Sequence, residues 1–185
     1  MRPMAKLSQA IADGDGISIL VEVSDGHAAE RAEAQGADGL VAGRGAAQVR
    51  ASSQLPLLHR GGTVDASGVA ADAIVLPPDL TAFEESLAFG LEGVVRVSST
   101  DQLGRALDRV DPEVLLLALD PGSDDDPLEA LLALLHDVPA GKLAIAELLD
   151  ATAEEVAELE RAGVDAVVVG TTEVGSLVPG GAPEV

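Results

Sequence analysis

Cysteine, tryptophan and tyrosine are absent from this sequence, and only two of its 185 residues are phenylalanine. The absence of cysteine excludes disulfide bonds, thiolate metal sites and cysteine nucleophiles. The scarcity of aromatic side chains argues against a site that stacks on bases or sugar rings. Hydrophobic residues still make up 47% of the chain, and most of them are Ala, Val and Leu. We therefore expect a core packed from small aliphatic side chains.

Basic residues are also scarce, because 11 Lys and Arg stand against 32 Asp and Glu and give a formal net charge of −21. A surface of this sign repels polyanions, so nucleic acid and anionic membranes are poor partners. Two interpretations of the acidity stay open. One is a solvated coat adapted to high salt, and the other is ordinary solubility in a proteome biased toward Ala and Arg.

Long apolar runs are missing as well. No stretch reaches the roughly 18 uninterrupted apolar residues that span a bilayer, and the first residues lack the apolar segment of a signal peptide. We therefore expect a soluble cytoplasmic protein. The length predicts one domain over residues 1–185, with residues 1–16 as a lead-in segment that includes a short helix over 4–11, and residues 175–185 as a frayed tail.

Short apolar runs alternate with helical patterns along the chain. The runs predict strands over residues 17–23, 40–42, 55–58, 73–76, 93–97, 114–119, 143–145 and 166–169. The intervening segments predict helices over 27–35, 81–89, 100–109 and 127–136 and a helix that begins after Thr152. A helix of one to two turns should end at residue 49, and residues 65–71 give only a poor helix signal. Two of these helices open with a capping-box pattern, Ser99 with Gln102 and Thr152 with Glu155.

The last unit, residues 142–174, reads strand, helix, strand. A short crossover between two fully apolar strands is typical of a parallel βαβ unit in a sheet covered on both faces. A corner motif that ends in an acid and a small residue recurs at residues 36–39, 90–93 and 163–166, with a close variant at 70–73. Eight repeated units predict a minimal (β/α)8 TIM barrel of parallel strands with short helices and loops. The alternative is a doubly wound open sheet, which normally has five or six strands.

Polar residues near the ends of these strands are the candidates for chemistry, because barrel sites lie at the carboxyl ends of the strands. Side chains alternate along a strand, and those in phase should converge on the barrel mouth: Glu22, Ser24, Arg60, Arg96, Ser98, Asp120 and Glu147. Glu22 and Arg96 interrupt apolar strands, where a charge must be paired. One interpretation is an anion site clamped by Arg60 and Arg96, with Glu147 or Glu22 moving protons. The other is a salt-bridge network that only fills the barrel.

Gly170, Thr171 and Thr172 follow the last strand, where such barrels often bind phosphate through backbone N–H groups. A glycine needed for a tight strand exit is the alternative. The segments 43–45 and 61–62 are turns rather than phosphate loops, because neither has a P-loop or dinucleotide-binding spacing.

Histidines and clustered acids add little to the site. His59 is one position out of phase with Arg60 and should lie at the rim or face the helices, whereas His27 and His136 should lie on the surface. Residues 124–126, three consecutive aspartates, fit a solvated loop better than a divalent-cation site, because their side chains point in different directions. No metal-ligand spacing is present, and nothing in the sequence requires a cofactor.

Residues 91–174 resemble indole-3-glycerol phosphate synthase, the (β/α)8 lyase of tryptophan biosynthesis. LEGVVRVSSTDQLGRAL is similar to the fifth-strand segment and following helix of that family, and AIAELLDATAEEVAELERAGVDAVVVGTTEV to its seventh and eighth units. LPLLHRGG is similar to its third strand, and ILVEVSDG to its first.

The resemblance implies roles for individual residues. Glu22 and Glu147 stand where the family has its first-strand and seventh-strand glutamates. Ser24 replaces a catalytic lysine, Arg60 the general-acid lysine, Arg96 a glutamate and Asp120 an asparagine. Gly170 and Thr171 keep the strand-eight part of the phosphate site, whereas Leu148 and Leu149 replace its Ser-Gly. Because arginine is a poor proton donor, the standard synthase reaction is not expected.

The sequence thus predicts a divergent barrel that binds a small anionic metabolite, phosphorylated or not, or acts on it as a lyase. In that prediction Glu22, Arg60 and Glu147 are catalytic, and Arg96, Asp120, Gly170 and Thr171 bind the anion. The alternative is a non-catalytic barrel, a degenerate paralogue or partner subunit, whose central charges stabilise only the fold.

Overall fold

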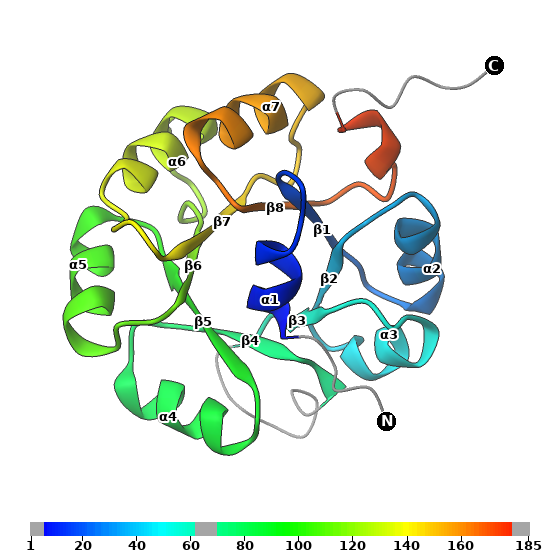
Figure 1. Ribbon diagram of the computed structural model, residues 1–185, viewed down its shortest axis with the longest axis horizontal. Helices are drawn as coiled ribbons and strands as arrows, with labels where there is room; N and C mark the ends of the chain where they lie inside the picture. Colours follow the sequence, from blue (N-terminus) through cyan, green and yellow to red (C-terminus); the bar gives the residue numbers. More distant parts are fainter. Residues whose placement is uncertain (1–5, 62–69, 179–185) are drawn as a thin grey trace.

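Eight parallel strands close into a barrel in the order β1 to β8 (Figure 1). The structure is a computed structural model that describes residues 6–61 and 70–178. The strands are β1 (Ser18–Glu22), β2 (Gly39–Ala42), β3 (Leu57–His59), β4 (Ala73–Leu76), β5 (Glu92–Val97), β6 (Val114–Leu117), β7 (Leu143–Glu147) and β8 (Ala166–Val169). Closure is complete because β1 pairs with β8, Ser18 opposite Ala166 and Val21 opposite Val169. The predicted (β/α)8 barrel is confirmed, and the open sheet is excluded.

Helices α2 to α7 surround the barrel as an outer ring, whereas α1 lies over its centre (Figure 1). The helices are α1 (Leu7–Ala12), α2 (Gly26–Ala34), α3 (Ala46–Ser52), α4 (Leu80–Ala88), α5 (Thr100–Arg109), α6 (Pro127–His136), α7 (Ala153–Ala162) and the 3-10 turn η2 (Val174–Ser176). Most of the poor helix signal over 65–71 and most of the predicted tail lie outside the described residues. Within residues 6–61 and 70–178, no helix is both long and apolar enough to cross a membrane.

Most strands differ from the sequence prediction by one or two residues at an end, and two of these changes have a clear cause. β3 begins at Leu57 instead of residue 55, because Pro56 has no N–H and offers only its carbonyl, which accepts from Leu40 N at 2.8 Å. β6 ends at Leu117 instead of residue 119, because the carbonyl of Leu119 turns toward the barrel mouth and accepts from an arginine there. Both changes shorten the strand by its irregular end and leave the side-chain phase unaltered.

The barrel interior is filled by alternate strand residues, as the composition predicts. Its members are small or branched aliphatic side chains, all buried: Leu20, Val41, Leu58, Ala73, Val75, Val94, Val114, Leu116, Ala118, Ile145, Ala166 and Val168. The other strand face packs against the helix ring in a second, larger cluster. On β4 the outward face belongs to a third, small cluster of Ile74, Leu76 and Leu91. Because both faces of the strands are covered, the strands have continuous apolar sequences.

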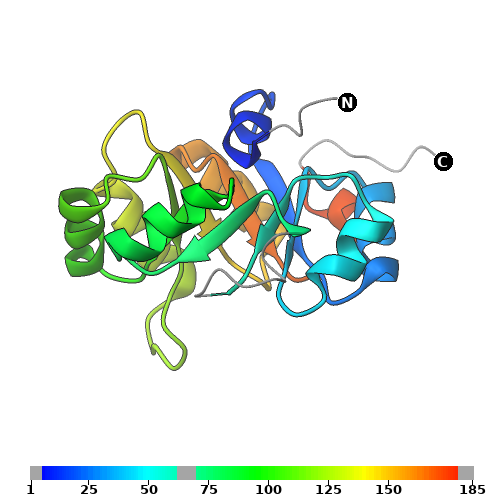
Figure 2. The same ribbon diagram turned by 90° about the horizontal axis from the view of Figure 1, so that it is seen from below.

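Helix α1 closes the amino-terminal end of the barrel, a role that the sequence did not indicate. Leu7 and Ile11 are 0% and 4% exposed and belong to the interior cluster. A carboxylate oxygen of Glu92 accepts from Ser8 N at 3.0 Å, so the start of β5 caps the start of α1. Figure 2 shows α1 on one face of the barrel and the loop that follows β6 on the opposite face. The carboxyl ends of the strands remain open.

The recurring corner acids hold neighbouring strands together. Asp38 accepts from Ile19 N, Asp72 from Leu57 N and Asp165 from Ala144 N, each at 2.8 Å. Each aspartate precedes an even-numbered strand and bonds to the preceding odd-numbered strand. The fourth corner acid is the longer Glu92, which instead reaches α1. The sequence repeat is therefore a structural device that fixes the register of strand pairs.

Local signals at the last helix behave as predicted. Thr152 accepts from Glu155 N, and the Glu155 side chain accepts from Thr152 N, so the capping box is complete. The helix ends at Gly163, whose φ of 99° places it in the left-handed region that favours glycine.

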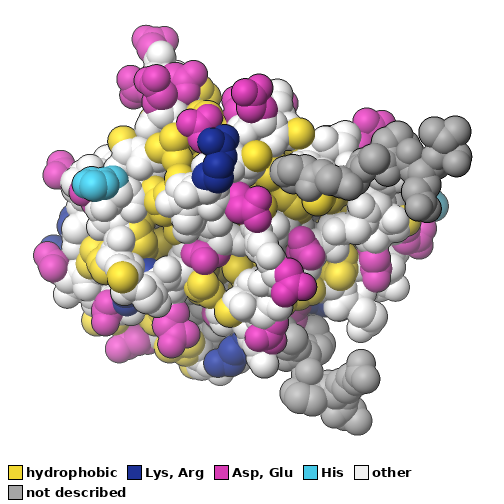
Figure 3. All heavy atoms as spheres, turned by 45° about the horizontal axis from the view of Figure 1, so that its top comes forward, with side chains coloured by type: hydrophobic (Ala, Val, Ile, Leu, Met, Phe, Trp, Pro, Cys, Tyr) yellow, Lys and Arg dark blue, Asp and Glu magenta, His cyan; other side chains and the backbone are white. Residues whose placement is uncertain are grey.

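Acidic side chains are spread over the surface and do not gather into one patch on the face seen in Figure 3. Few Lys or Arg side chains interrupt them there, in keeping with the excess of 32 acids over 11 bases. Such a distribution leaves the molecule with a broadly negative field.

Candidate functional site

The alternation of side chains along the strands brings the predicted charges together at the open end of the barrel. Glu22 and Glu147 end β1 and β7, Arg60 follows β3, and Arg96 is the fifth residue of β5. All four share the phase of the interior cluster, two positions beyond one of its members. The barrel geometry thus gathers two acids and two bases from four different strands.

Arg60 is the centre of one group of charges. Its Nη2 donates to Glu147 Oε2 at 2.5 Å and lies 3.5 Å from Glu22 Oε2. Burial opposes the charge of the guanidinium, but the hydrogen bond and charge of Glu147, with the charge of Glu22, outweigh it and raise the pKa of Arg60 above its ordinary value. Arg60 therefore stays a cation and cannot serve as a proton donor in turnover.

Arg96 is the centre of a second group. Its Nη1 donates to Asp120 Oδ1 at 3.2 Å, and its Nη2 donates to the carbonyl of Leu119 at 2.8 Å. The hydroxyl of Ser98 donates to Asp120 Oδ2 at 2.8 Å. This hydrogen bond, followed by that from Arg96, holds the pKa of the Asp120 carboxyl below its ordinary value of 3.8. The Asp120 side chain is 64% exposed and lies on the rim.

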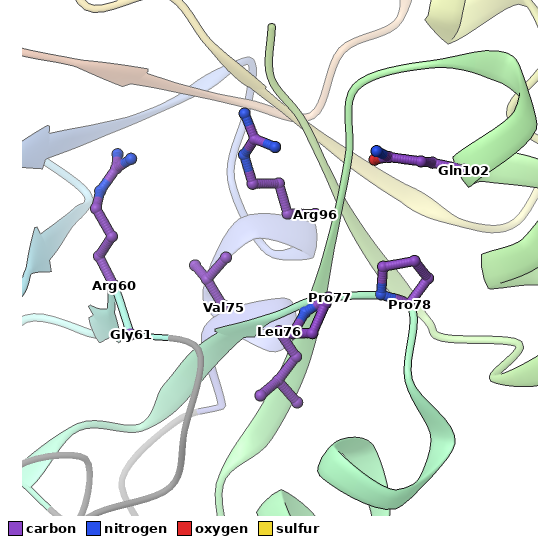
Figure 4. A pocket seen from close by; sticks show the side chains of 8 residues that line it. All are labelled: Arg60, Gly61, Val75, Leu76, Pro77, Pro78, Arg96 and Gln102. Atoms are coloured by element: carbon purple, nitrogen blue, oxygen red, sulfur yellow. The ribbon is translucent and has the colours of Figure 1, made fainter. Parts of the chain in front are cut away.

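A pocket of about 540 Å³ opens between the two arginines at the carboxyl ends of β3, β4 and β5. Figure 4 shows Arg60 and Arg96 on either side of Val75, with their guanidinium ends extending in the same direction. The lining residues are Arg60, Gly61, Val75, Leu76, Pro77, Pro78, Arg96 and Gln102. Four of them form an apolar wall, and the Pro77-Pro78 pair ends β4 at this level. The arrangement can hold a small molecule with an anionic end.

Gly170 and Thr171 do not line this pocket. Gly170 N donates to the carbonyl of Leu149 at 2.8 Å, and Thr171 Oγ1 accepts from Glu173 N at 3.1 Å. A Cβ at Gly170 would lie 3.3 Å from the Leu149 carbonyl oxygen, so glycine fits a tight exit from β8. The phosphate role of this segment stays a prediction, and one of its N–H groups already has a protein partner.

The remaining candidates lie elsewhere. His59 is 5% exposed and points out of the barrel on the phase of Leu57, which agrees with a helix-facing position. His27 and His136 are exposed, and so are residues 124–126, of which Asp126 caps α6 by accepting from Glu129 N. Over the described ranges, no three His, Asp or Glu side chains lie close enough to hold a metal ion.

Sequence reasoning missed Gln102 and the apolar wall from β4 as parts of the site. Gln102 was assigned only a capping role, in which its side chain would accept from Ser99 N. Its Oε1 accepts instead from Ser98 N at 3.0 Å, one residue earlier. The available signal was the position of Gln102. It lies three residues after Ser99, the N-cap of the helix that follows β5, and β5 carries the charge of Arg96. The wall could not be found, because Val75 and Leu76 read as ordinary core residues.

Comparison with known proteins gives one partial sequence likeness. No protein-family model matches the chain. Indole-3-glycerol phosphate synthase from Variovorax paradoxus (strain S110) is 32% identical over 148 residues, which cover 72% of this chain and 55% of that protein. The chain therefore spans about half the length of this curated relative.

Two solved structures share the architecture over most of the chain. N-acetylmannosamine-6-phosphate 2-epimerase from Clostridium perfringens superposes with a TM-score of 0.70 at 15% identity, over 87% of each chain. Thiamine phosphate pyrophosphorylase from Pyrococcus furiosus superposes with a TM-score of 0.64 at 17% identity, over 87% of this chain and 90% of that one. At such identities the likeness shows the fold alone. The chain has the fold of a compact TIM barrel, with a partial sequence likeness to indole-3-glycerol phosphate synthase.

Proposed function

We propose that this barrel binds a small anionic metabolite between Arg60 and Arg96. The observation that carries the proposal is one pocket at the carboxyl ends of the strands that both Arg60 and Arg96 line. That end is where TIM-barrel enzymes place their sites. Small metabolites suit this protein better than nucleic acid or anionic membranes, because its net charge is −21.

The arginines retain donors for a ligand despite their protein partners. A guanidinium has five N–H donors. Among the described residues, Arg60 uses Nη2 for Glu147 and Glu22, and Arg96 uses Nη1 for Asp120 and Nη2 for Leu119, so that other N–H groups of both arginines have no partner there. The apolar wall beside them lowers the local dielectric, which strengthens a charge-assisted hydrogen bond to a carboxylate or phosphate.

A phosphorylated ligand and lyase-type chemistry form the finer part of the proposal. The three similar proteins are named for substrates or products that carry phosphate. Because Arg60 remains protonated, proton transfer falls to Glu147, which lies against it, or to Glu22. Arg60 then orients the carboxylate and holds the anion, in line with the site residues predicted from the sequence.

A second candidate function has its own support. Both arginines are already paired with protein carboxylates, and three acids face two bases at the barrel mouth. A barrel whose central charges only stabilise the fold, and which catalyses nothing, would look the same.

The two candidates are separated by measuring anion binding with calorimetry and thermal unfolding. We expect inorganic phosphate at millimolar concentration to raise the melting temperature saturably, and Arg96→Ala to abolish the effect. Arg44→Ala is the matched control, since Arg44 is exposed on the loop after β2 and does not line the pocket. If phosphate, sulfate and sugar phosphates all leave the wild-type melting temperature unchanged, the non-catalytic barrel is the better description.

A further inference from the structure

The orientation of the Gln102 side-chain amide is fixed by the protein. Gln102 is the third residue of α5, and its Oε1 lies 3.0 Å from Ser98 N and 3.3 Å from Ser98 Oγ. A backbone N–H can only donate, so the atom that faces it must be the amide oxygen. The opposite assignment would place two donors against each other.

The amide nitrogen of Gln102 is consequently left for the pocket. Gln102 lines the pocket, and Figure 4 shows its amide end extending from α5 toward the side of Arg96. The hydrogen bonds of the described residues include none from this nitrogen to a protein acceptor. Two N–H donors are therefore available to a ligand beside the Arg96 guanidinium.

Among the described residues, every polar side chain of the pocket lining carries N–H donors. These side chains belong to Arg60, Arg96 and Gln102, and the other lining side chains are Val75, Leu76, Pro77 and Pro78. The nearby carboxylates are paired with the arginines, Glu147 and Glu22 with Arg60, and Asp120 with Arg96. An ammonium group beside the two guanidinium cations would be repelled, and a hydroxyl against the apolar wall would lose its water without a partner there, which is costly.

We infer that Gln102 is a specificity-determining residue, and that with Arg96 it selects a ligand whose anionic end carries only acceptors on a body poor in donors. The chemical class is an apolar carboxylate or phosphate rather than a polyol acid or an amine. This inference rests on the proposed function, since it names the substrate class of the same pocket. A site built from donors discriminates strongly against groups that leave its donors unpaired.

The side-chain amides give a direct readout. The sequence has five glutamines and no asparagine, so ¹H–¹⁵N spectra hold five side-chain NH2 pairs, and the pair that disappears in Gln102→Glu identifies Gln102. We expect hexanoate to shift this pair saturably, gluconate to bind at least tenfold more weakly, and hexylammonium to leave the pair unmoved. Equal binding of gluconate and hexanoate would overturn the donor-poor class.

The variant Gln102→Glu separates the role of Gln102 in ligand selection from its hydrogen bond to Ser98 N. It keeps an oxygen for Ser98 N but replaces both donors by a charged acceptor, so we expect at least tenfold weaker hexanoate binding with an unchanged urea midpoint. Gln48→Glu makes the same charge change at an exposed position on α3 and should bind like the wild type.

If Gln102→Glu binds hexanoate with wild-type affinity, the proposed role of Gln102 is overturned while the anion site stays intact. Failure of the wild type to bind either hexanoate or phosphate would overturn the proposed function itself, and this inference with it.

Discussion

One guanidinium nitrogen of Arg60 serves two carboxylates that come from opposite ends of the sequence. Glu22 belongs to β1 and Glu147 to β7, and neither has another cation as close in the described part of the chain. The Glu147 side chain is 15% exposed and that of Arg60 is 34% exposed. The pair is thus half-buried, a setting in which the loss of one partner leaves the other charge poorly solvated.

Replacing Arg60 by methionine should destabilise the fold by about 1–3 kcal/mol, a range set below that of a fully buried pair because the arginine is partly exposed. The variant Arg60→Met/Glu147→Gln should recover part of the loss, because the stranded charge is removed. Urea unfolding of both variants measures the coupling. Losses that simply add in the double variant would show that the pair is not coupled.

The Asp120 carboxyl gives a prediction for pH. Its folded pKa is lowered by Ser98 and Arg96 from 3.8, so its contribution to stability is present above the unfolded pKa and is lost as pH falls through the lower folded value. Ser98→Ala should raise the folded Asp120 pKa toward 3.8, so that the loss is smaller and ends at a higher pH, whereas Ser98→Thr keeps the hydroxyl and should not. Carboxyl ¹³C titration reports the pKa, and identical titrations in wild type and Ser98→Ala would contradict the assignment.

At the scale of elements, α1 covers the amino-terminal end of the barrel. Small aliphatic residues fill the middle of the barrel, and Leu7 and Ile11 complete the floor from outside the strands. The helix has only six residues and no side-chain N-cap of its own. Packing against the barrel and the bond from Ser8 N to Glu92 therefore hold it in place, rather than helix propensity.

Leu7→Ala should lower the free energy of unfolding by about 2–4 kcal/mol, since it removes a fully buried side chain and leaves a cavity. Leu87→Ala on α4, where the leucine is 55% exposed, should change it by no more than about 0.5 kcal/mol. Chemical denaturation of the two variants is the measurement. Similar small effects would mean that α1 does not contribute to the core.

The corner aspartates can be tested in the same way. Asp165→Ala removes the acceptor of Ala144 N and should cost about 1–2 kcal/mol, whereas Asp165→Asn keeps an acceptor oxygen and should cost less. Asp150, an exposed acid before α7, provides the control Asp150→Ala. If Asp165→Ala unfolds at the same urea concentration as Asp150→Ala, the hydrogen bond does not tie the strands.

At the scale of the whole molecule, like charges dominate the surface. With 32 acids and 11 bases, the folded chain concentrates negative charge that the unfolded chain spreads out. Figure 3 shows acidic side chains over the visible face with few basic neighbours. Stability should therefore depend on ionic strength more than in a balanced protein.

Raising NaCl from about 0.02 M to about 0.5 M should stabilise the fold by ~1–2 kcal/mol, most of it below about 0.15 M, where the Debye length shortens to about 8 Å. Urea midpoints at constant pH give the measurement, and sucrose at matched osmolality controls for exclusion effects. A midpoint independent of salt would show that self-repulsion does not limit stability and would favour ordinary solubility over salt adaptation.

Much of the fold was accessible from the sequence because its signals are local. Buried strands read as short apolar runs, and Thr152 with Glu155 marked the start of α7. The phase of Glu22, Arg60, Arg96 and Glu147 was also predictable, since alternation along a strand depends only on neighbouring residues. β3 was displaced because Pro56 changes where pairing can begin.

The sequence by itself determined the number of strands, their apolar character, the charges at their ends and the sign of the surface field. Only the tertiary structure decided that Arg60 joins Glu22 to Glu147, that α1 closes the floor, and that Gln102 turns its amide nitrogen to the pocket. The physical reason is distance along the chain. Periodicity and capping act over a few residues, whereas these contacts depend on barrel closure, which brings together residues far apart in the sequence.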